Sequence, residues 1–194
     1  MGDHAHFPAD RASRLNDERR LETQLSNADM ARLLDLTGAE DVVDLGSGTG
    51  FYTDRVAALT TGTVYAIELQ AEMNDAYRER GVPENVQLVL GDITALSLAP
   101  ASADVAISIA TWHEVEGGLD LPGLVRALRP PGKLVVIDWR KDPESLDHGP
   151  PAGIRSTKEE VMDALAPYFD QVSTENLGRF MFAVVARRKA LATS

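Results

Sequence analysis

The sequence contains no cysteine, which excludes disulfides, thiolate metal sites and a cysteine nucleophile. It also lacks any apolar run near the roughly 20 residues that a membrane-spanning helix needs. The N-terminal residues are polar and have no apolar centre of the kind that a secretion signal requires. These absences predict a cytoplasmic protein with no membrane segment.

Positive charge is scarce as well, since 19 Lys and Arg stand against 30 Asp and Glu, which gives a net charge of −11. An acidic surface repels phosphate backbones, so nucleic acid is not an expected partner. Internal repeats and low-complexity segments are absent too, and a length of 194 residues suits a single domain. The oligomeric state stays open between a monomer and a homodimer.

Short apolar segments alternate with amphipathic ones along the chain. The apolar segments are rich in β-branched residues, as are strands that are buried on both faces of a sheet. They lie at 42–45, 63–67, 86–90, 104–109 and 133–137, and the stretches with helical spacing lie between or before them at 30–36, 51–59, 71–80 and 119–128. The alternation predicts an α/β fold, a three-layer Rossmann-like sandwich around a mostly parallel sheet.

The C-terminal third departs from this alternation. Residues 140–156 contain three Pro and two Gly and predict a long loop. A capping box at Thr157 opens a helix that we expect to reach about residue 168. The segments 171–176 and 180–186 are separated by a short turn and predict a hairpin. We therefore expect a seven-stranded sheet with an antiparallel C-terminal hairpin strand.

Ligands of such a sheet bind beyond the carboxyl ends of the strands, at the point where the strand order reverses. There the first strand, which contains Asp44, is followed by GSGTG at 46–50 and then by a helix. Glycines at this spacing let the backbone turn sharply, and the amides at the helix start face an anion or a carboxylate. The spacing differs from the G-x-G-x-x-G dinucleotide motif, and an ordinary glycine-rich turn is the alternative.

Acidic residues follow the next two strands. Glu68 stands where a side chain can accept hydrogen bonds from both hydroxyls of a ribose, although a solvated charge is the simpler interpretation. Asp92 can accept from an exocyclic amine while the neighbouring amide donates to a ring nitrogen, although it can also cap the next helical turn. Three such elements at three successive strand ends point to one ligand site.

These motifs resemble those of the class I S-adenosylmethionine-dependent methyltransferases. The matching segments are VVDLGSGTG at 42–50, Glu68, GDI at 91–93 and LRPPGKLVVID at 128–138. The resemblance spans residues 28–188 and implies S-adenosylmethionine as the cofactor. It is specific for the fold and the cofactor, and much less so for the methyl acceptor.

The resemblance implies how the methionine part of the cofactor would be bound. The glycine-rich segment would surround it with Gly46, Ser47, Gly48 and Gly50. Asp44 would lie near the amino group of the methionine.

The adenosine part would be held at the following strand ends, again as the resemblance implies. Glu68 would hold the ribose, and Leu69 would lie beside the adenine. Asp92 would face the adenine amine and Ile93 its ring. Ile109, at the end of the fourth strand, would close the site near the sulfonium.

Several methyltransferase subgroups do not fit the sequence. It lacks the [DN]-P-P-[YF] segment of adenine and amide N-methyltransferases, and the cysteines of cytosine-C5 and arsenite methyltransferases. Asp138 alone does not make the carboxylate set of catechol-type enzymes, so no metal site is expected. The remaining pattern resembles the small-molecule methyltransferases near the ubiquinone and menaquinone biosynthesis group.

In that group a His-Glu pair often follows the fourth strand, where this sequence has His113 and Glu114. His113 is our candidate for a catalytic general base, because the pKa of histidine lies near working pH. The equally weighted alternative is that the pair only shapes the cofactor pocket, since the sulfonium carries its own leaving group and proximity can suffice. Adjacent side chains tend to point apart, so we do not expect this pair to bind a metal.

Four residues are candidates for binding the acceptor. Trp112 and Trp139 can stack on an aromatic ring. The cations Arg140 and Arg155 suit a negatively charged acceptor. Each residue taken alone has an ordinary interpretation, as a core tryptophan or a solvated arginine.

Residues 1–25 are too few for a substrate domain. We interpret them as an N-terminal lid or extension of the cofactor-binding domain at 26–194. If they form a lid, Arg14 and Leu15 are the candidates for contact with the cofactor. A frayed terminus is the alternative.

The sequence thus predicts an enzyme that transfers the sulfonium methyl group to a small-molecule acceptor by in-line displacement. Two alternatives stay open. One is a non-catalytic relative that binds the nucleotide as a sensor or scaffold. The other is a protein or RNA methyltransferase that acts with a partner.

Overall fold

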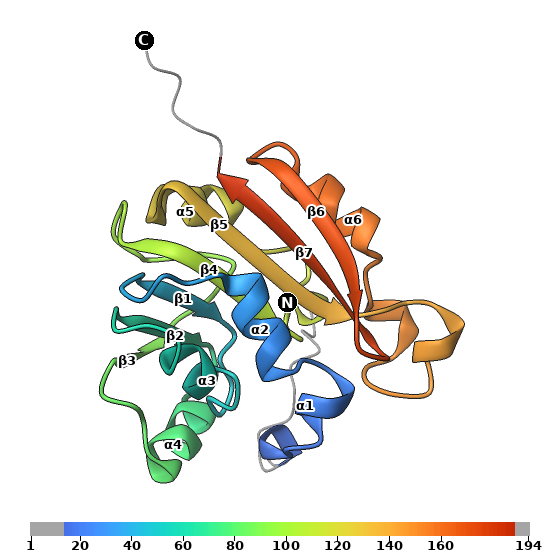
Figure 1. The fold of residues 1–194 in the computed structure, drawn as a ribbon, viewed down its shortest axis with the longest axis horizontal. Helices are drawn as coiled ribbons and strands as arrows, with labels where there is room; N and C mark the ends of the chain where they lie inside the picture. The colour runs from blue at the N-terminus through green and yellow to red at the C-terminus, as the bar shows by residue number, and fades with distance from the viewer. Residues whose placement is uncertain (1–13, 189–194) are drawn as a thin grey trace.

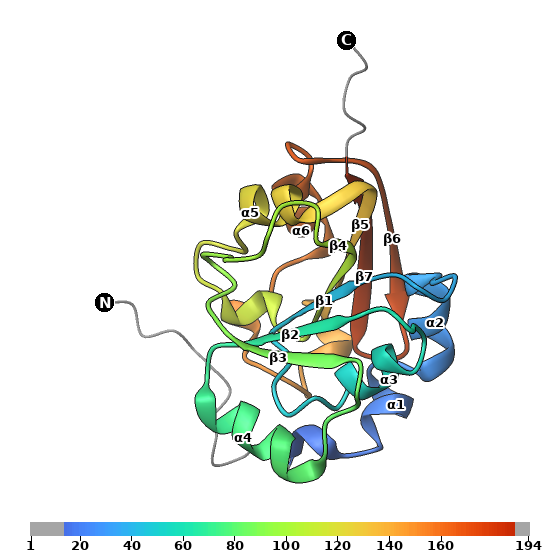
Figure 2. The same cartoon turned by 90° about the vertical axis from the view of Figure 1, so that its left-hand side faces the viewer.

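The computed structural model describes residues 14–188, which form a seven-stranded sheet in the order β3-β2-β1-β4-β5-β7-β6 (Figures 1 and 2). Neighbouring strands pair in parallel except that β7 is antiparallel to both β5 and β6. The predicted mostly parallel sheet with an antiparallel C-terminal hairpin strand is therefore confirmed. The strands are β1 Val42–Leu45, β2 Val64–Glu68, β3 Val86–Leu90, β4 Ala103–Ile109, β5 Leu128–Trp139, β6 Phe169–Leu177 and β7 Met181–Arg188.

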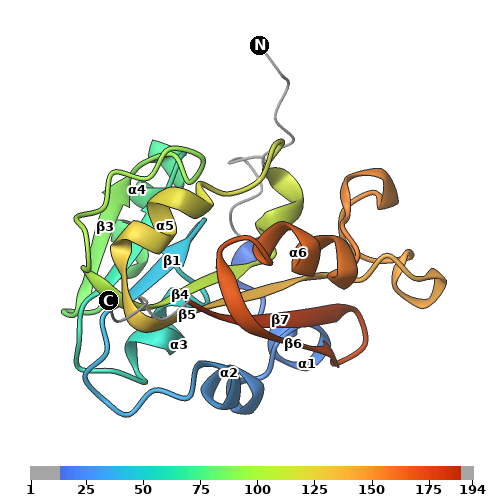
Figure 3. The same cartoon turned by 90° about the horizontal axis from the view of Figure 1, so that it is seen from above.

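Helices cover both faces of this sheet, as the predicted three-layer sandwich requires. Figure 3 shows α2 and α3 on one side of the sheet and α5 and α6 on the other. Within the described residues, no helix is both long and apolar enough to cross a membrane. The helices are α1 Arg20–Thr23, α2 Asn27–Leu34, α3 Thr53–Ala57, α4 Ala71–Arg80, α5 Leu121–Ala127 and α6 Lys158–Leu165.

Each face of the sheet carries its own apolar cluster, because successive residues of a strand point to opposite sides. Val42 of β1 packs in the cluster with α2 and α3, whereas Val43 packs in the cluster with α5 and α6. All four residues of β1 are buried. This burial on both faces explains why the strands are continuous apolar runs in the sequence.

Capping side chains set the starts of three helices. The capping box predicted at Thr157 is present, because its hydroxyl accepts from the amide of Glu160 while the Glu160 carboxylate accepts from the amide of Thr157. Ser26 caps α2 and Asp120 caps α5 in the same way, through side-chain oxygens. These two caps were not predicted, and they account for the difference between the observed and predicted starts of α2 and α5.

Three other element boundaries also differ from the prediction. α3 begins at Thr53 rather than at residue 51, because the chain is still turning after the glycine-rich segment. α6 ends at Leu165, short of the predicted residue 168. β5 begins at Leu128, because the two prolines that follow cannot continue the preceding helix.

The segment 140–156 is a loop, as predicted, with two short 3-10 turns at Pro143–Ser145 and Ala152–Ile154. It follows the carboxyl end of β5 and projects beyond the sheet (orange in Figure 3). The carboxyl end of β5 lies at the edge of the sheet where the ligand site was expected.

Candidate functional site

A cavity of about 830 Å³ opens at the carboxyl ends of β1, β2, β3, β4 and β5. β1 and β4 are neighbours in the sheet, although β2 and β3 come between them in the sequence. The strand order therefore reverses here. The N-terminal segment from residue 14 and the 140–156 loop contribute to its lining. The volume lies at the upper end of the range for small-molecule sites, about 300–1,000 Å³. The cavity therefore has room for a cofactor and a small second ligand.

The predicted cofactor residues gather on one side of this cavity, with one exception. A Cβ on Gly50 would meet the ring of Tyr77 at 2.1 Å, so this glycine lets α4 pack against the loop and does not line the cavity. The predicted residues that do line it are Asp44, Gly46, Ser47, Gly48, Glu68, Leu69, Asp92, Ile93 and Ile109.

The glycine loop presents its backbone to the cavity. Gly46 and Gly48 both have positive φ, +80° and +55°. A Cβ on Gly46 would meet the Thr111 side chain at 2.4 Å, whereas one on Gly48 would meet the tip of Leu15 at 3.3 Å. Gly46 is therefore required by packing against Thr111, two residues after β4, and Gly48 lies at the open side of the loop.

Asp44 lies beneath this loop and is 2% exposed. Thr53 Oγ1 donates a hydrogen bond of 2.6 Å to its carboxylate. Burial raises the pKa of Asp44 to about 6 against the effect of this hydrogen bond, and the charge of Glu68 adds to the rise. Asp44 is thus ionised at neutral pH, as an ammonium ligand requires, and loses its charge as the pH falls through about 6.

Two carboxylates mark the ends of β2 and β3. Glu68 accepts from the amides of Gly48 and Gln70, at 2.9 and 2.8 Å, so it holds the glycine loop against β2. Asp92 accepts from the amide and the hydroxyl of Thr94, at 2.8 and 2.7 Å. The capping interpretation of Asp92 is therefore present in the structure, and the residue lines the cavity as well.

The polar groups on this side suit S-adenosylmethionine. Ser47 Oγ is buried and has no hydrogen-bond partner within residues 14–188, and a buried hydroxyl normally finds one. The carboxylates of Asp44 and Glu68 suit an ammonium group and a ribose. Leu69 is 45% exposed, and an aromatic ring would cover it. These residues would hold the methionine part, the ribose and the adenine in that order along the cavity.

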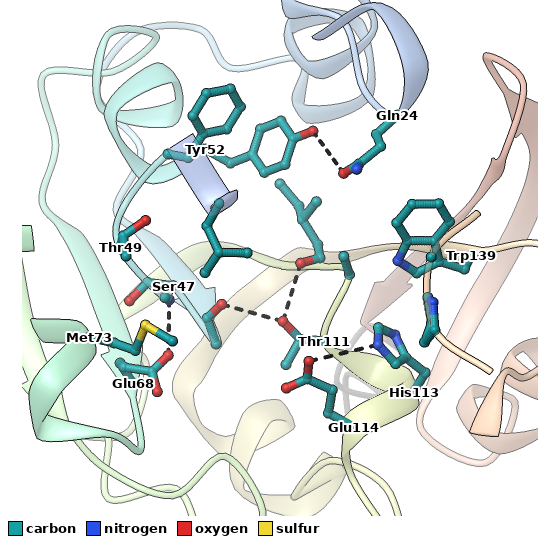
Figure 4. A pocket seen from close by; sticks show the side chains of 18 of the residues that line it. Gln24, Ser47, Thr49, Tyr52, Glu68, Met73, Thr111, His113, Glu114 and Trp139 are labelled. Atoms are coloured by element: carbon teal, nitrogen blue, oxygen red, sulfur yellow. Dashed lines mark hydrogen bonds and ion pairs between the residues drawn. The ribbon is translucent and has the colours of Figure 1, made fainter. Parts of the chain in front are cut away.

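His113 and Glu114 line the cavity opposite this polar side, near Trp139 (Figure 4). They lie in the 3-10 turn Trp112–Glu114 that follows β4. His113 Nδ1 is 2.8 Å from Asp138 Oδ1, and His113 Nε2 is 3.8 Å from Glu114 Oε1. The imidazole therefore lies between two carboxylates, although adjacent side chains were expected to point apart.

The pKa of His113 is raised above its ordinary value. Burial and the charge of Arg155 act in the opposite direction, but the hydrogen bond and charge of Asp138, together with the charge of Glu114, outweigh them. Within residues 14–188, no group of three or more His, Asp or Glu side chains is placed to hold a metal ion. This region is thus suited to proton transfer.

Three of the four predicted acceptor residues are neighbours, because Arg155 lies 5.6 Å over the Trp139 ring and donates to the carbonyl of Arg140, but they do not all face the cavity. Trp139 lines the cavity, but Trp112 is buried in the apolar cluster on the α5 and α6 side. Arg140 forms an ion pair with Asp142 at 2.5 Å. Neither Arg140 nor Arg155 lines the cavity, so the expected cationic acceptor site is not formed there.

Arg155 instead holds the 140–156 loop together. It is 2% exposed, and its guanidinium donates to the carbonyls of Arg140, Ser145 and Pro150 at 2.7, 3.0 and 2.8 Å. It also donates to the carbonyl of His148. The loop lacks regular structure, so this one side chain takes the place of a hydrogen-bonded ladder.

We expect Arg155→Met to reduce the free energy of unfolding by about 3 kcal/mol, because several buried carbonyls lose their donor. Urea denaturation measures the loss. The matched control is Arg78→Met, which removes an exposed ion pair with Asp75 and should cost less than about 1 kcal/mol. Equal effects of the two substitutions would show that Arg155 does not hold the loop.

The N-terminal segment lines the cavity beside the glycine loop. Arg14 and Leu15, the predicted contacts, are both in its lining. Asn16 Oδ1 accepts a hydrogen bond of 2.8 Å from Thr49 Oγ1, which ties the segment to the loop. The rest of the predicted lid, residues 1–13, lies outside the described residues.

Some lining residues were not predicted. Tyr52 and Gln24 face each other at 3.5 Å at the top of the cavity in Figure 4, and Arg20 lies 4.6 Å over the Tyr52 ring. Residues 148–151 form part of the wall near Trp139. The position of Tyr52, two residues after Gly50, could have predicted it. No local pattern marks residues 148–151 beyond the length of their loop.

Comparison with known proteins agrees with this geometry. The methyltransferase domain family matches residues 43–136. An uncharacterised methyltransferase of Mycobacterium tuberculosis is 34% identical over 108 residues, which are 56% of this chain and 43% of that protein. A demethylmenaquinone methyltransferase of Clavibacter sepedonicus is 26% identical over 160 residues, which are 82% of this chain and 62% of that protein. The chain thus spans less than two thirds of either relative.

A solved structure is similar over nearly the whole chain. The S-adenosylmethionine-dependent methyltransferase of Aquifex aeolicus superposes with a TM-score of 0.84 and 27% identity, over 95% of this chain and 100% of that one. Residues 43–136 contain the glycine loop, Glu68, Asp92 and His113. Residues 43–136 therefore match a methyltransferase domain, and this match together with the solved structure implies S-adenosylmethionine as the cofactor.

Proposed function

We propose that this chain transfers the methyl group of S-adenosylmethionine to a small-molecule acceptor. The observation that carries the proposal is one cavity with two unlike sides. The glycine loop and two strand-end carboxylates supply the polar side, and His113 lies on the other side with Trp139. Thr111 lies between the two sides in Figure 4, which is where the methyl group would pass.

The residues of the chain then have separate tasks. The cofactor, when bound, supplies a methyl group on a sulfonium, and the sulfur is a good leaving group. The glycine loop and Glu68 hold the cofactor in one orientation, and the cavity walls hold the acceptor in line with it. His113 accepts a proton from the acceptor where the pKa of the acceptor group is too high for that group to be deprotonated at neutral pH. The demethylmenaquinone methyltransferase among the relatives agrees with a small acceptor.

We also propose that residues 1–25 act as a lid on the domain formed by residues 26–194. Three contacts support a closed position of the described part. Asn16 bonds Thr49, Glu18 pairs with Arg55 at 2.8 Å, and Leu15 faces Gly48. A closed segment would exclude water from the reacting groups.

Two measurements test the proposed function. Calorimetry with S-adenosylhomocysteine should show saturable binding well below about 1 mM. Incubation with cofactor labelled on its methyl group, against a library of small molecules, should then transfer the label. Absence of binding at millimolar ligand would contradict the proposal. Binding without transfer to any compound would favour the non-catalytic alternative.

Glu68→Ala should weaken binding of S-adenosylhomocysteine by about 10- to 100-fold, because the ribose and the Gly48 amide both lose a charged acceptor. The matched control is Glu72→Ala on the exposed side of α4, which should leave the affinity unchanged. Calorimetry on both variants makes the comparison. An unchanged affinity in Glu68→Ala would remove this residue from the cofactor site.

A further inference from the structure

We propose that the methyl acceptor is a neutral aromatic alcohol, whose hydroxyl proton passes to Nε2 of His113, and that Asp138 is the residue that positions this imidazole. The inference rests on the proposed function and names the acceptor class for the same site. It is carried by the surroundings of His113 and by the walls of the cavity near it.

Asp138 fixes the orientation of His113. It is 2% exposed at the end of β5, and its oxygens accept from the backbone amides of His113 and Trp139, at 3.2 and 2.6 Å. The backbone amides therefore hold the carboxylate in place independently of the imidazole. Its Oδ1 lies 2.8 Å from His113 Nδ1, so in the neutral ring Nδ1 carries the proton and Nε2 is the proton acceptor.

A negatively charged side chain, that of Glu114, lies on the cavity side of this imidazole. Nε2 lies 3.8 Å from Glu114 Oε1, and both residues line the cavity. The arginines that line the cavity come from the N-terminal segment, and those of the 140–156 loop are bound within the loop. An anionic acceptor would meet the charge of Glu114, whereas Arg155, the loop cation nearest to His113, donates to backbone carbonyls and does not line the cavity, which favours a neutral acceptor.

The walls near His113 suit a flat ring. Trp139 lies near His113 in Figure 4, and Val115, Pro150, Pro151 and Ile154 line the same cavity. Ile154 is 36% exposed, so it offers apolar surface that a ligand can cover. Aromatic and proline side chains stack on planar groups and lose little conformational freedom in doing so.

A positioned base distinguishes a hydroxyl from an amine. A neutral amine has a free electron pair and attacks without losing a proton first. A phenolic hydroxyl has a pKa near 10 and is a weak nucleophile until a neighbouring base takes its proton. An amine needs the His113–Asp138 pair only to take a proton after the attack, whereas the hydroxyl needs it for the attack itself.

The step balances with no further reactant. The hydroxyl proton moves to His113 Nε2 while the acceptor oxygen forms a bond to the methyl carbon. The carbon–sulfur bond breaks, and its electron pair stays on sulfur. The products are a methyl ether, S-adenosylhomocysteine and a proton, which the imidazolium releases to water.

The acceptor class is tested with three compounds that share one ring system: 2-naphthol, 2-naphthylamine and 2-naphthoate. Calorimetry with protein saturated in S-adenosylhomocysteine should show binding of 2-naphthol at least about tenfold tighter than that of 2-naphthoate. Labelled cofactor should then methylate 2-naphthol in preference to the amine and the carboxylate. Preferred methylation of either of these, or no methylation of the naphthol by protein that binds S-adenosylhomocysteine, would overturn the inference. Loss of S-adenosylhomocysteine binding itself would instead contradict the proposed function.

The positioning role is tested by Asp138→Asn, read by NMR titration of the His113 ring. Asp138, Glu114 and Arg155 are the charged groups that face this ring, and removing the charge of Asp138 should move its titration to lower pH by about one unit. The acid limb of the turnover profile should move with it, while affinity for S-adenosylhomocysteine stays within about twofold of the wild type. Asp163→Asn, on the exposed side of α6, is the matched control and should change none of these.

A second variant keeps this test valid if Asp138→Asn does not fold. Glu114→Gln leaves the backbone contacts of Asp138 intact and should also move the His113 titration to lower pH. A titration that stays in place in whichever of the two variants folds would show that the altered carboxylate does not act on the imidazole, and would overturn the positioning role.

Discussion

Gly48→Val should weaken binding of S-adenosylhomocysteine by about 100-fold or more. The new side chain would project into the gap between the glycine loop and Leu15, where a Cβ already comes within 3.3 Å of the Leu15 tip. This gap belongs to the side of the cavity that also holds Asp44 and the unpartnered Ser47 hydroxyl. The loss would therefore arise from exclusion of the cofactor and not from unfolding, and calorimetry measures it.

The control for this experiment is Gly178→Val, in the turn between β6 and β7. Gly178 has φ of +48°, close to the +55° of Gly48, and a Cβ there meets atoms at 3.6 Å, an ordinary contact. Both substitutions should reduce the free energy of unfolding by about 1–2 kcal/mol through left-handed strain. Only Gly48→Val should change the affinity. A similar loss of affinity in both variants would mean that strain, and not occlusion, is responsible.

Much of the fold could be predicted because parallel strands covered on both faces are continuous apolar runs. The segment 42–45 is an example, since every residue in it is buried and all but Asp44 are apolar. The exception is informative, because a carboxylate that stays in such a strand requires a partner. The position of β7 between β5 and β6 could not be derived from the hairpin pattern alone, which gives the pairing of two strands but not which of them joins the sheet.

The cofactor side was predictable for a related reason. Its residues directly follow strands, so the topology fixes where they meet. Gly50 shows the limit of this reasoning, because its neighbour Tyr77 comes from a distant helix. Motif position alone does not distinguish a glycine that faces a ligand from one that faces a ring.

The acceptor side could be predicted less well because loop geometry places its residues. Ala110, directly after β4, has φ of +53°, which is unusual for alanine and turns the chain before Trp112 and His113. No residue type in the sequence predicts that turn. The partners of Arg155 are backbone carbonyls of its own loop, and carbonyls leave no pattern in a sequence. For this reason the sequence could not show that Arg140 and Arg155 lie outside the lining of the cavity.

His113→Ala should reduce turnover by about 100- to 10,000-fold, the range for loss of a general base. The affinity for S-adenosylhomocysteine should change by less than about threefold, because the imidazole lies on the side of the cavity opposite the glycine loop. His113→Gln should be equally slow, since an amide keeps the size and polarity of the side chain but cannot take a proton. Rescue by Gln, or equal losses in turnover and affinity, would make His113 a residue that only shapes the pocket.

The pH profile supplies an independent measurement on the wild-type protein. The base must be neutral to act, and the pKa of His113 is raised by Asp138 and Glu114 despite burial. Turnover should therefore be highest above this raised pKa and fall as the pH drops through it, so that the acid limb lies above the ordinary histidine value near 6.5. Burial raises the pKa of Asp44 to about 6, and we expect this residue to act through cofactor binding, so saturation with cofactor would separate the two groups. A saturated rate that is independent of pH between about 5.5 and 8.5 would contradict a histidine base, because the neutral imidazole fraction changes across that range.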